Sequence, residues 1–392
     1  MSTPAPTDTR HSDRRRRLLW LITAGFLLLA AGYLIYWLLI GRFFVSTDDA
    51  YVRGNLVPLT ARVAGTVTAI TGDDTDLVRA GSPVVMLDPT NARLKLDQAE
   101  AALAAAVRSA RAARAQWHAL QSAAQAAHVR YELAASDERR RRHLAAIDAI
   151  SRESWRHTRA TAQTLAAQYR AAVARARAQQ AVAGTRPLRR LPAIRQAMTA
   201  VKTAYLDLTH CVVRAPVTGY IAKRHVQLGQ RVTAHETLLV IIPLQRLWVS
   251  ANFKETDLGS LRIGQPARVV ADIYGDKVVY HGRVAGIGAG TGSAFALLPP
   301  SNASGNWIKI VQRVPVRISL PSRLLAQHPL RVGLSTDVTV NIHHTKGPVL
   351  ASRPPAIPRY RTDIYGHALQ GARVLIDKIL QANGAQVAAH GR

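Results

Sequence analysis

The sequence predicts an α+β protein of several domains, in which a long helical hairpin is inserted into a small β-sandwich. A short β-type pattern occurs twice: RVAGTV at 62–67 with VRAGSPVVMLDP at 78–89, then PVTGYI at 216–221 with VQLGQRV at 226–232 and LLVIIP at 238–243. The stretch from 91 to 208, which separates the copies, is dominated by the helix formers Ala, Gln, Arg and Leu.

Neither copy of the β pattern is long enough to bury a core alone, so we expect the two to pair. Each copy has a Val-x-Gly turn, at Gly65 and Gly219, and a second glycine further on, at Gly81 and Gly229. We therefore predict one split β-sandwich built from 60–89 and 209–245. Everything between these segments then projects outward from a single point.

Residues 18–40 form an apolar run without a charge, with aromatic residues near its ends. An uncharged run of this length spans a bilayer as a helix. The basic tail 1–17 carries Arg10 and four consecutive arginines at 14–17. By the positive-inside rule, this tail lies in the cytoplasm. A cleaved signal peptide is the competing interpretation, but GRFFVS at 41–46 lacks a small-x-small cleavage site. We thus expect residues 43–392 to lie outside the cytoplasm, on a single-pass anchor.

A heptad pattern predicts an antiparallel coiled coil over 90–208. The outgoing seam is Leu96, Ala99, Leu103, Ala106, Ala110, Ala113, Trp117, Leu120, Ala124, Ala127, Tyr131 and Ala134, and the returning seam is Trp155, Thr158, Ala162, Leu165, Tyr169, Ala172, Ala176, Ile194, Ala197, Val201, Ala204 and Leu208. The seam lapses in between, so we place the tip near 144–150. Each arm would reach roughly 80 Å. Gly184, Pro187 and Pro192 predict a break in the returning arm.

Short apolar runs separated by Gly, Pro and Asp predict a small antiparallel β-barrel over 246–345. The segment 45–59 is expected to contribute an entering strand to this barrel. The C-terminal segment 346–392 has helical spacing of apolar residues near 363–382.

The composition contains no sign of catalysis or of a cofactor. The net charge of +28 suits nucleic-acid binding, but the predicted topology places most of it beyond the membrane, away from nucleic acid. The single cysteine, Cys211, is expected in the core. No zinc spacing, Walker loop or nucleophile elbow occurs, and GIGAGTG at 286–292 is not followed by a helical pattern. We therefore predict that the protein is not an enzyme and holds no metal.

Several stretches resemble periplasmic adaptors, or membrane fusion proteins, of the HlyD family, and within it the EmrA-like branch that serves major-facilitator efflux pumps. These stretches are STDDAYVRGN (46–55), APVTGYIAKRHVQLGQ (215–230), LWVSANFKETDLGSLRIGQPA (247–267), DIYGDKVVYHGRV (272–284), GTGSAFALLP (290–299) and SGNWIKIVQRVPVRI (304–318). The resemblance implies that the split sandwich is lipoyl-like. The hairpin replaces the turn that carries the modified lysine of lipoyl carriers, so a carrier role is disfavoured.

The resemblance further implies a multidrug efflux role without enzymatic activity. Such adaptors link an inner-membrane transporter to an outer-membrane channel of the TolC type, several copies forming a ring or tube. In related adaptors the hairpin tip carries an Arg, a Leu four residues on and a Ser seven residues later, which Arg140, Leu144 and Ser151 match. These three residues are the predicted channel-docking site, although Ser151 also suits a plain helix N-cap.

Two alternatives remain open at the level of the sequence. One is an adaptor for an ABC-driven secretion system, against which the shorter hairpin and the EmrA-like block at 290–318 argue. The other is an envelope tether without transport. It is motivated by the charge of the hairpin: residues 91–207 contain 21 Lys and Arg and 8 Asp and Glu, which gives a net charge of +13. That charge also suits a merely solvated face.

Overall fold

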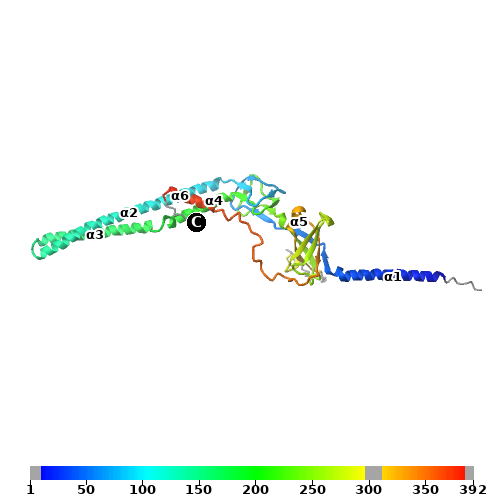
Figure 1. Ribbon diagram of the computed structural model, residues 1–392. Coiled ribbons are helices and arrows are strands. Elements are labelled where there is room, and N and C mark those ends of the chain that lie inside the picture. Colours follow the sequence, from blue (N-terminus) through cyan, green and yellow to red (C-terminus); the bar gives the residue numbers. More distant parts are fainter. Residues whose placement is uncertain (1–9, 296–310, 385–392) are drawn as a thin grey trace, which may run out of the picture.

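The structure, a computed structural model, describes residues 10–295 and 311–384. Figure 1 shows an elongated molecule in which α1, the barrel, the sandwich and the helical hairpin follow one another from one end to the other. Residues 1–9, 296–310 and 385–392 lie outside the described residues, and with them much of the basic tail and of the block at 290–318.

The first element is α1 (Arg10–Leu39), whose residues from Leu19 onward are exposed on every face. The stretch Leu19–Phe43 is long and apolar enough to cross a membrane, and its most apolar window is not covered by any other described part of the chain. A helix that is apolar all round and has no protein partner needs lipid around it. The predicted single N-terminal apolar helix is confirmed, and the short turn η1 (Gly41–Phe43) joins it to the barrel.

Seven antiparallel strands form the barrel sheet in the order β1-β15-β12-β13-β14-β11-β2. They are β1 (Phe44–Thr47), β2 (Ala50–Arg53), β11 (Trp248–Lys254), β12 (Pro266–Ala271), β13 (Val279–Ile287), β14 (Arg313–Ser319) and β15 (Thr336–Asn341), with η3 (Leu244–Arg246), η4 (Gly275–Lys277), η5 (Ser293–Phe295) and α5 (Ser322–Gln327) between them. Although β1 and β2 are consecutive in the chain, they pair with opposite edges, and Tyr51 also bridges Ser335. The entering chain therefore closes the sheet into the predicted small barrel.

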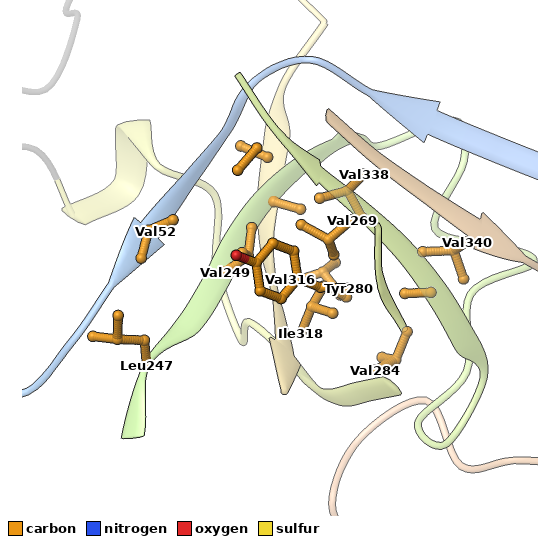
Figure 2. Close-up of a cluster of buried hydrophobic side chains, with 14 of the residues drawn as sticks. Val52, Leu247, Val249, Val269, Tyr280, Val284, Val316, Ile318, Val338 and Val340 are labelled. Atoms are coloured by element: carbon orange, nitrogen blue, oxygen red, sulfur yellow. The ribbon is translucent and has the colours of Figure 1, made fainter. Parts of the chain in front are cut away.

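Valine is the commonest residue of the buried barrel core, and along β12 and β15 buried positions alternate with exposed or half-buried ones. Figure 2 shows Val249, Val269 and Val338 around the ring of Tyr280. The Tyr280 side chain is fully buried, and its hydroxyl donates a hydrogen bond to the backbone oxygen of His328 at 2.8 Å. Burial raises the pKa of Tyr280 to about 12, because ionisation would place a charge in the apolar core.

The sandwich consists of two four-stranded sheets, and each sheet takes two strands from each half of the sequence. The first half supplies β3 (Val57–Thr60), β4 (Gly65–Ile70), β5 (Leu77–Val78) and β6 (Pro83–Leu87), and the second supplies β7 (Val212–Arg214), β8 (Gly219–Arg224), β9 (Arg231–Val232) and β10 (Thr237–Ile242). The orders are β3-β10-β8-β5 and β7-β6-β4-β9, and both halves contribute to one core. Gly65 and Gly219 therefore open strands of one domain, as predicted.

A constant shift of 154 positions relates the two halves of the sandwich. It carries Gly65 at the start of β4 onto Gly219 at the start of β8, and the two sheet orders map onto each other under it. The hydrogen bonds follow the same rule: the amide of Thr75 donates to the Ile221 oxygen at 2.9 Å, and the amide of Gly229 donates to the Val67 oxygen at 2.9 Å. The sandwich is thus an internal two-fold repeat in which each half completes the other.

The shift of 154 positions shows that the second glycines of the two sequence copies, Gly81 and Gly229, are not equivalent. Gly81 corresponds to His235 and Gly229 corresponds to Thr75, so the two glycines mark different turns of the repeat. All four residues adopt positive φ, at 85° and 71° for the first pair and 80° and 77° for the second. The backbone conformation is shared by the two halves while the residue type is not. Thr75 and His235 are exposed, and the amide of each donates a hydrogen bond to the other half of the sandwich, so a non-glycine residue is held there at a modest cost.

The expected entering strand over 45–59 is divided between two domains. Its first part forms β1 and β2 of the barrel, whereas β3 pairs with β10 at the edge of the sandwich. Pro58 has no amide hydrogen and fits such an edge. Between the two, Gly54 passes so close to Leu247 that a Cβ at position 54 would lie 2.7 Å from its Cδ2 atom. The expectation of one barrel strand was therefore wrong for 57–59.

The hairpin consists of α2 (Thr90–Ala146), α3 (Arg152–Ala183) and α4 (Pro192–His210), with η2 (Leu188–Arg190) in the break between the last two. The 57 residues of α2 correspond to about 85 Å. Every predicted seam position is buried or half-buried. The predicted break in the returning arm begins at Gly184, where φ is 66°. The long helical coiled-coil hairpin is thus confirmed.

The C-terminal helix α6 (Gln370–Ala382) packs against the base of the hairpin, beside α2 and α4 (Figure 1). Ile376 and Leu380 join Leu103 and Ile194 in a shared buried cluster. The helix begins later than the predicted 363, because turns around Gly366 occupy the residues before it.

The segment 346–369 runs from the barrel past the sandwich to α6. Thr362 donates to the backbone oxygen of Pro216 at 2.8 Å, and the guanidinium of Arg62 stacks 3.8 Å from the ring centre of Tyr365. Thr362 and Tyr365 therefore contact the sandwich, and α6 contacts the hairpin base.

Candidate functional site at the hairpin tip

The tip is a short turn between the end of α2 at Ala146 and the start of α3 at Arg152. The amide of Ala149 donates to the Leu144 oxygen at 2.9 Å, and Asp148 adopts a left-handed conformation with φ of 52°. Asp is among the residues that tolerate this conformation. These features reverse the chain within five residues, 147–151, between the two long helices.

The structure places the three predicted docking residues around this turn. The Arg140 side chain is 73% exposed and pairs with Asp137 at 2.5 Å, so it lies on the outer face of α2. Leu144 is half-buried in the last turn of α2. Ser151 is exposed, and its hydroxyl oxygen accepts a hydrogen bond from the Ser154 amide at 3.2 Å. Ser151 is therefore the N-cap of α3, which leaves its hydroxyl free to make a further contact.

Sequence reasoning missed a buried carboxylate just below the tip. Glu138 is 7% exposed and accepts hydrogen bonds from Arg142, at 2.8 and 3.0 Å from Nη2, and from the indole Nε1 of Trp155 at 3.2 Å. The hydrogen bonds from Arg142 lower the pKa of the Glu138 carboxyl, burial opposes them, and the Trp155 bond adds to the lowering. Because Trp155 belongs to α3, this network ties the two arms together next to the docking residues.

Sequence reasoning also missed Ile147, which is 64% exposed at the turn. Its position is off the heptad seam, so the pattern assigns it no partner within the hairpin. Together with Arg140 and the partly exposed Leu144, it presents apolar surface beside an exposed guanidinium. Such a surface can bury apolar side chains in a groove of another protein and form a charge-assisted hydrogen bond beside it. Among residues 10–295 and 311–384, no group of three or more His, Cys, Asp and Glu is placed to hold a metal ion.

The hairpin matches the family model described as the EmrA α-helical hairpin domain, over residues 90–210. Over 349 residues, the chain is 42% identical to the multidrug export protein EmrA of Escherichia coli (strain K12), covering 89% of this chain and 90% of that one. The chain belongs to the EmrA family. The fatty acid resistance protein FarA of Neisseria gonorrhoeae is 45% identical to this EmrA-family chain over 316 residues, covering 80% of each.

A solved structure of the periplasmic adaptor protein EmrA is similar to this EmrA-family chain at 20% identity and a TM-score of 0.37, covering 76% of this chain and 98% of that one. The resemblance to membrane fusion proteins inferred from the sequence is confirmed by family membership. The chain thus belongs to a family whose members include multidrug export proteins.

Proposed function

We propose that the protein is a periplasmic adaptor that links an inner-membrane drug exporter to a TolC-type outer-membrane channel. The observation that carries this proposal is the linear arrangement of a membrane helix at one end and an exposed hairpin tip at the other (Figure 1). The arginines in the first turns of α1, ahead of its apolar stretch, support a cytoplasmic N-terminus. An adaptor anchored in this way brings the tip across the periplasm while α1 and the barrel stay beside the exporter.

The exporter partner we propose is a pump of the major-facilitator type, and the cargo is hydrophobic drugs or other amphiphiles. Support comes from similarity to a multidrug export protein and to a fatty acid resistance protein. Transport energy would come from the exporter. Several copies would form a ring or tube, because a single hairpin of two helices cannot enclose a channel.

Removal of residues 1–42 tests the anchor and its role. We expect a protein that is released from the membrane fraction and no longer restores drug efflux in a strain lacking the gene. A product that stays in the membrane after this deletion would contradict the assignment of α1 as the anchor. Deletion of the whole gene is expected to raise the accumulation of several amphiphilic compounds, whereas unchanged accumulation would favour the non-transporting tether.

The docking assignment predicts that Arg140, Leu144 and Ser151 contact the channel, with Ile147 between them. A photo-crosslinking residue at Ile147 should capture the outer-membrane channel, identified by mass spectrometry. Leu144→Asp should reduce this crosslink at least about tenfold, since a charge does not enter an apolar groove. Leu133→Asp is the matched control, because Leu133 is 73% exposed on α2 away from the tip.

Leu144 is half-buried, so the fold of the tip must be checked in the same sample. Hydrogen exchange of peptides covering 134–160 should be the same in Leu144→Asp as in wild type. Undiminished crosslinking in Leu144→Asp, or equal loss in Leu133→Asp, would refute the docking role of this residue.

A further inference from the structure

The half of the hairpin nearer the sandwich carries a dense group of arginines without acidic residues. No Asp or Glu occurs in 101–131 or in 154–206. We call residues 104–118 of α2 and 172–195 of the returning arm the basic belt, which contains nine arginines. The two segments lie side by side, since Gln179 donates to the backbone oxygen of Ala113 at 3.3 Å and Arg114 donates to that of Arg186. Fifteen residues of helix span only about 22 Å, so the charge density is high.

The described part of the chain leaves this charge almost uncompensated. There, the one carboxylate within ion-pair distance of a belt arginine is Asp377 of α6, which lies 2.9 Å from Arg189. The same helix also carries Arg373 and Lys378, so its docking adds net positive charge to the region. Like charges held this close destabilise a fold through repulsion. The fold does not require this cost, because Gln or Ala would serve equally well on the exposed positions of a helix.

The position of the belt excludes a membrane surface as its partner. The barrel and the sandwich separate it from α1 (Figure 1). On the other side, 28 residues of α2 between position 118 and Ala146 hold it about 42 Å below the tip. Attraction to the headgroups of a membrane falls off within a Debye length, which is about 8 Å at physiological salt. If the tip reaches the outer membrane, the belt lies between the two membranes.

A second copy of the chain does not neutralise the belt either. Copies anchored by α1 in one membrane stand parallel, so their belts lie at the same height and face like charge. An extended polyanion that runs across the hairpins fits better, because many weak ion pairs then add up. Guanidinium groups also bind carboxylates in a planar, two-pronged geometry.

We propose that the basic belt binds the carboxylate-bearing peptide and glycan network of the cell wall. The inference rests on the proposed periplasmic orientation of the hairpin. Binding to the wall would hold the rod upright between the membranes, while the tip and the barrel remain available for the channel and the exporter.

The test is co-sedimentation of the full chain in detergent with purified peptidoglycan sacculi. The belt variant carries Gln in place of Arg175, Arg177, Arg190 and Arg195, all exposed and all on the returning arm. The control variant removes the same charge from the barrel and sandwich through Gln at the exposed residues Arg79, Arg231, Arg323 and Arg331. We expect the belt variant to lower the bound fraction about tenfold or more, since multivalent ion pairs weaken together. The control should stay within about twofold of wild type, and wild-type binding should fall as salt rises.

Sacculi whose carboxylates have been converted to amides provide the chemical control, and they should not bind. Equal binding of native and amidated sacculi, or equal loss in the belt and control variants, would overturn the proposal. So would belt-dependent binding to lipopolysaccharide vesicles without binding to sacculi. Sacculus binding needs neither exporter nor channel, so a failed efflux assay with intact sacculus binding would refute the proposed function alone.

Discussion

The Glu138 network makes a quantitative prediction about the hairpin tip. Glu138→Ala removes the acceptor of the Trp155 indole and the partner of Arg142. A hydrogen bond to a charged group contributes about 1.5–3 kcal/mol. The Arg142 side chain is 63% exposed, so its pair with Glu138 adds only about 0.5 kcal/mol. Because Trp155 is half-buried, we take its hydrogen bond at the lower end of the range of about 1.5–3 kcal/mol. Together with the Arg142 pair, the expected loss in local stability is about 2 kcal/mol.

Hydrogen exchange measures this local stability directly. A loss of about 2 kcal/mol corresponds to roughly 30-fold faster exchange of amides near the tip, at one decade per 1.36 kcal/mol. The peptides to follow cover 134–160. Glu132→Ala is the matched control on the same helix, because the Glu132 side chain is 63% exposed. Glu138→Gln should lie in between, since the amide oxygen can still accept from Trp155 but the charge is gone.

The pH dependence has a defined sign. The pKa of Glu138 is lowered in the folded protein, so the ionised form stabilises the fold. The advantage of wild type over Glu138→Gln should be fully present above the unfolded value of about 4.3 and be lost as pH falls through the folded pKa. A change below threefold in Glu138→Ala, or the same change in Glu132→Ala, would show that this network does not hold the two arms together.

Three further changes test other parts of the fold. Gly219→Ala places a Cβ 2.6 Å from a backbone oxygen of β10, whereas Gly65→Ala at the equivalent position meets only a side chain at 3.2 Å. In urea denaturation, Gly219→Ala should lower the unfolding free energy by about 2 kcal/mol, and Gly65→Ala by less than about 1 kcal/mol. Tyr280→Phe should cost about 1 kcal/mol in the same assay, because it removes the hydrogen bond to the backbone oxygen of His328. Arg140→Ala should leave the melting temperature unchanged within about 1 °C, since exposed ion pairs contribute little.

Local periodicity predicted the parts of the fold that depend on it. The three-four spacing from Leu96 to Ala134 marked the seam correctly, because a helix buries residues at that period whatever its partner. The same spacing continued past Ala134 reaches position 138, so a polar residue on the seam was the available signal for the Glu138 network. It was overlooked because a charged seam residue also marks the end of a coiled coil.

Contacts between distant segments were beyond the reach of such patterns. The pairing of α6 with the hairpin base joins Ile376 to Leu103, and nothing in either local sequence specifies the other. The equivalence of His235 with Gly81 was hidden for a different reason. A positive φ favours glycine, but a turn whose amide is hydrogen-bonded to the other half can hold another residue there, so residue type alone misaligned the two halves.

The sandwich also sets the direction of the hairpin, and this leads to a last prediction. The arms leave from β6 and return to β7, which are neighbouring strands that pair Met86 with Val212. Both arms therefore start side by side, and small seam residues let them remain close along their length. Repeating residues 121–127 in α2 and 165–171 in α3 adds one heptad to each arm, which preserves the seam and lengthens the rod by about 10 Å.

The lengthened protein should keep its melting temperature while its tip moves away from the height at which the channel is met. Efflux should then fall, whereas repeating 121–124 in α2 alone should lower stability, because it shifts one seam against the other. Full efflux with the longer rod would mean that reach is not what the hairpin supplies, and the proposed bridging role would have to be abandoned.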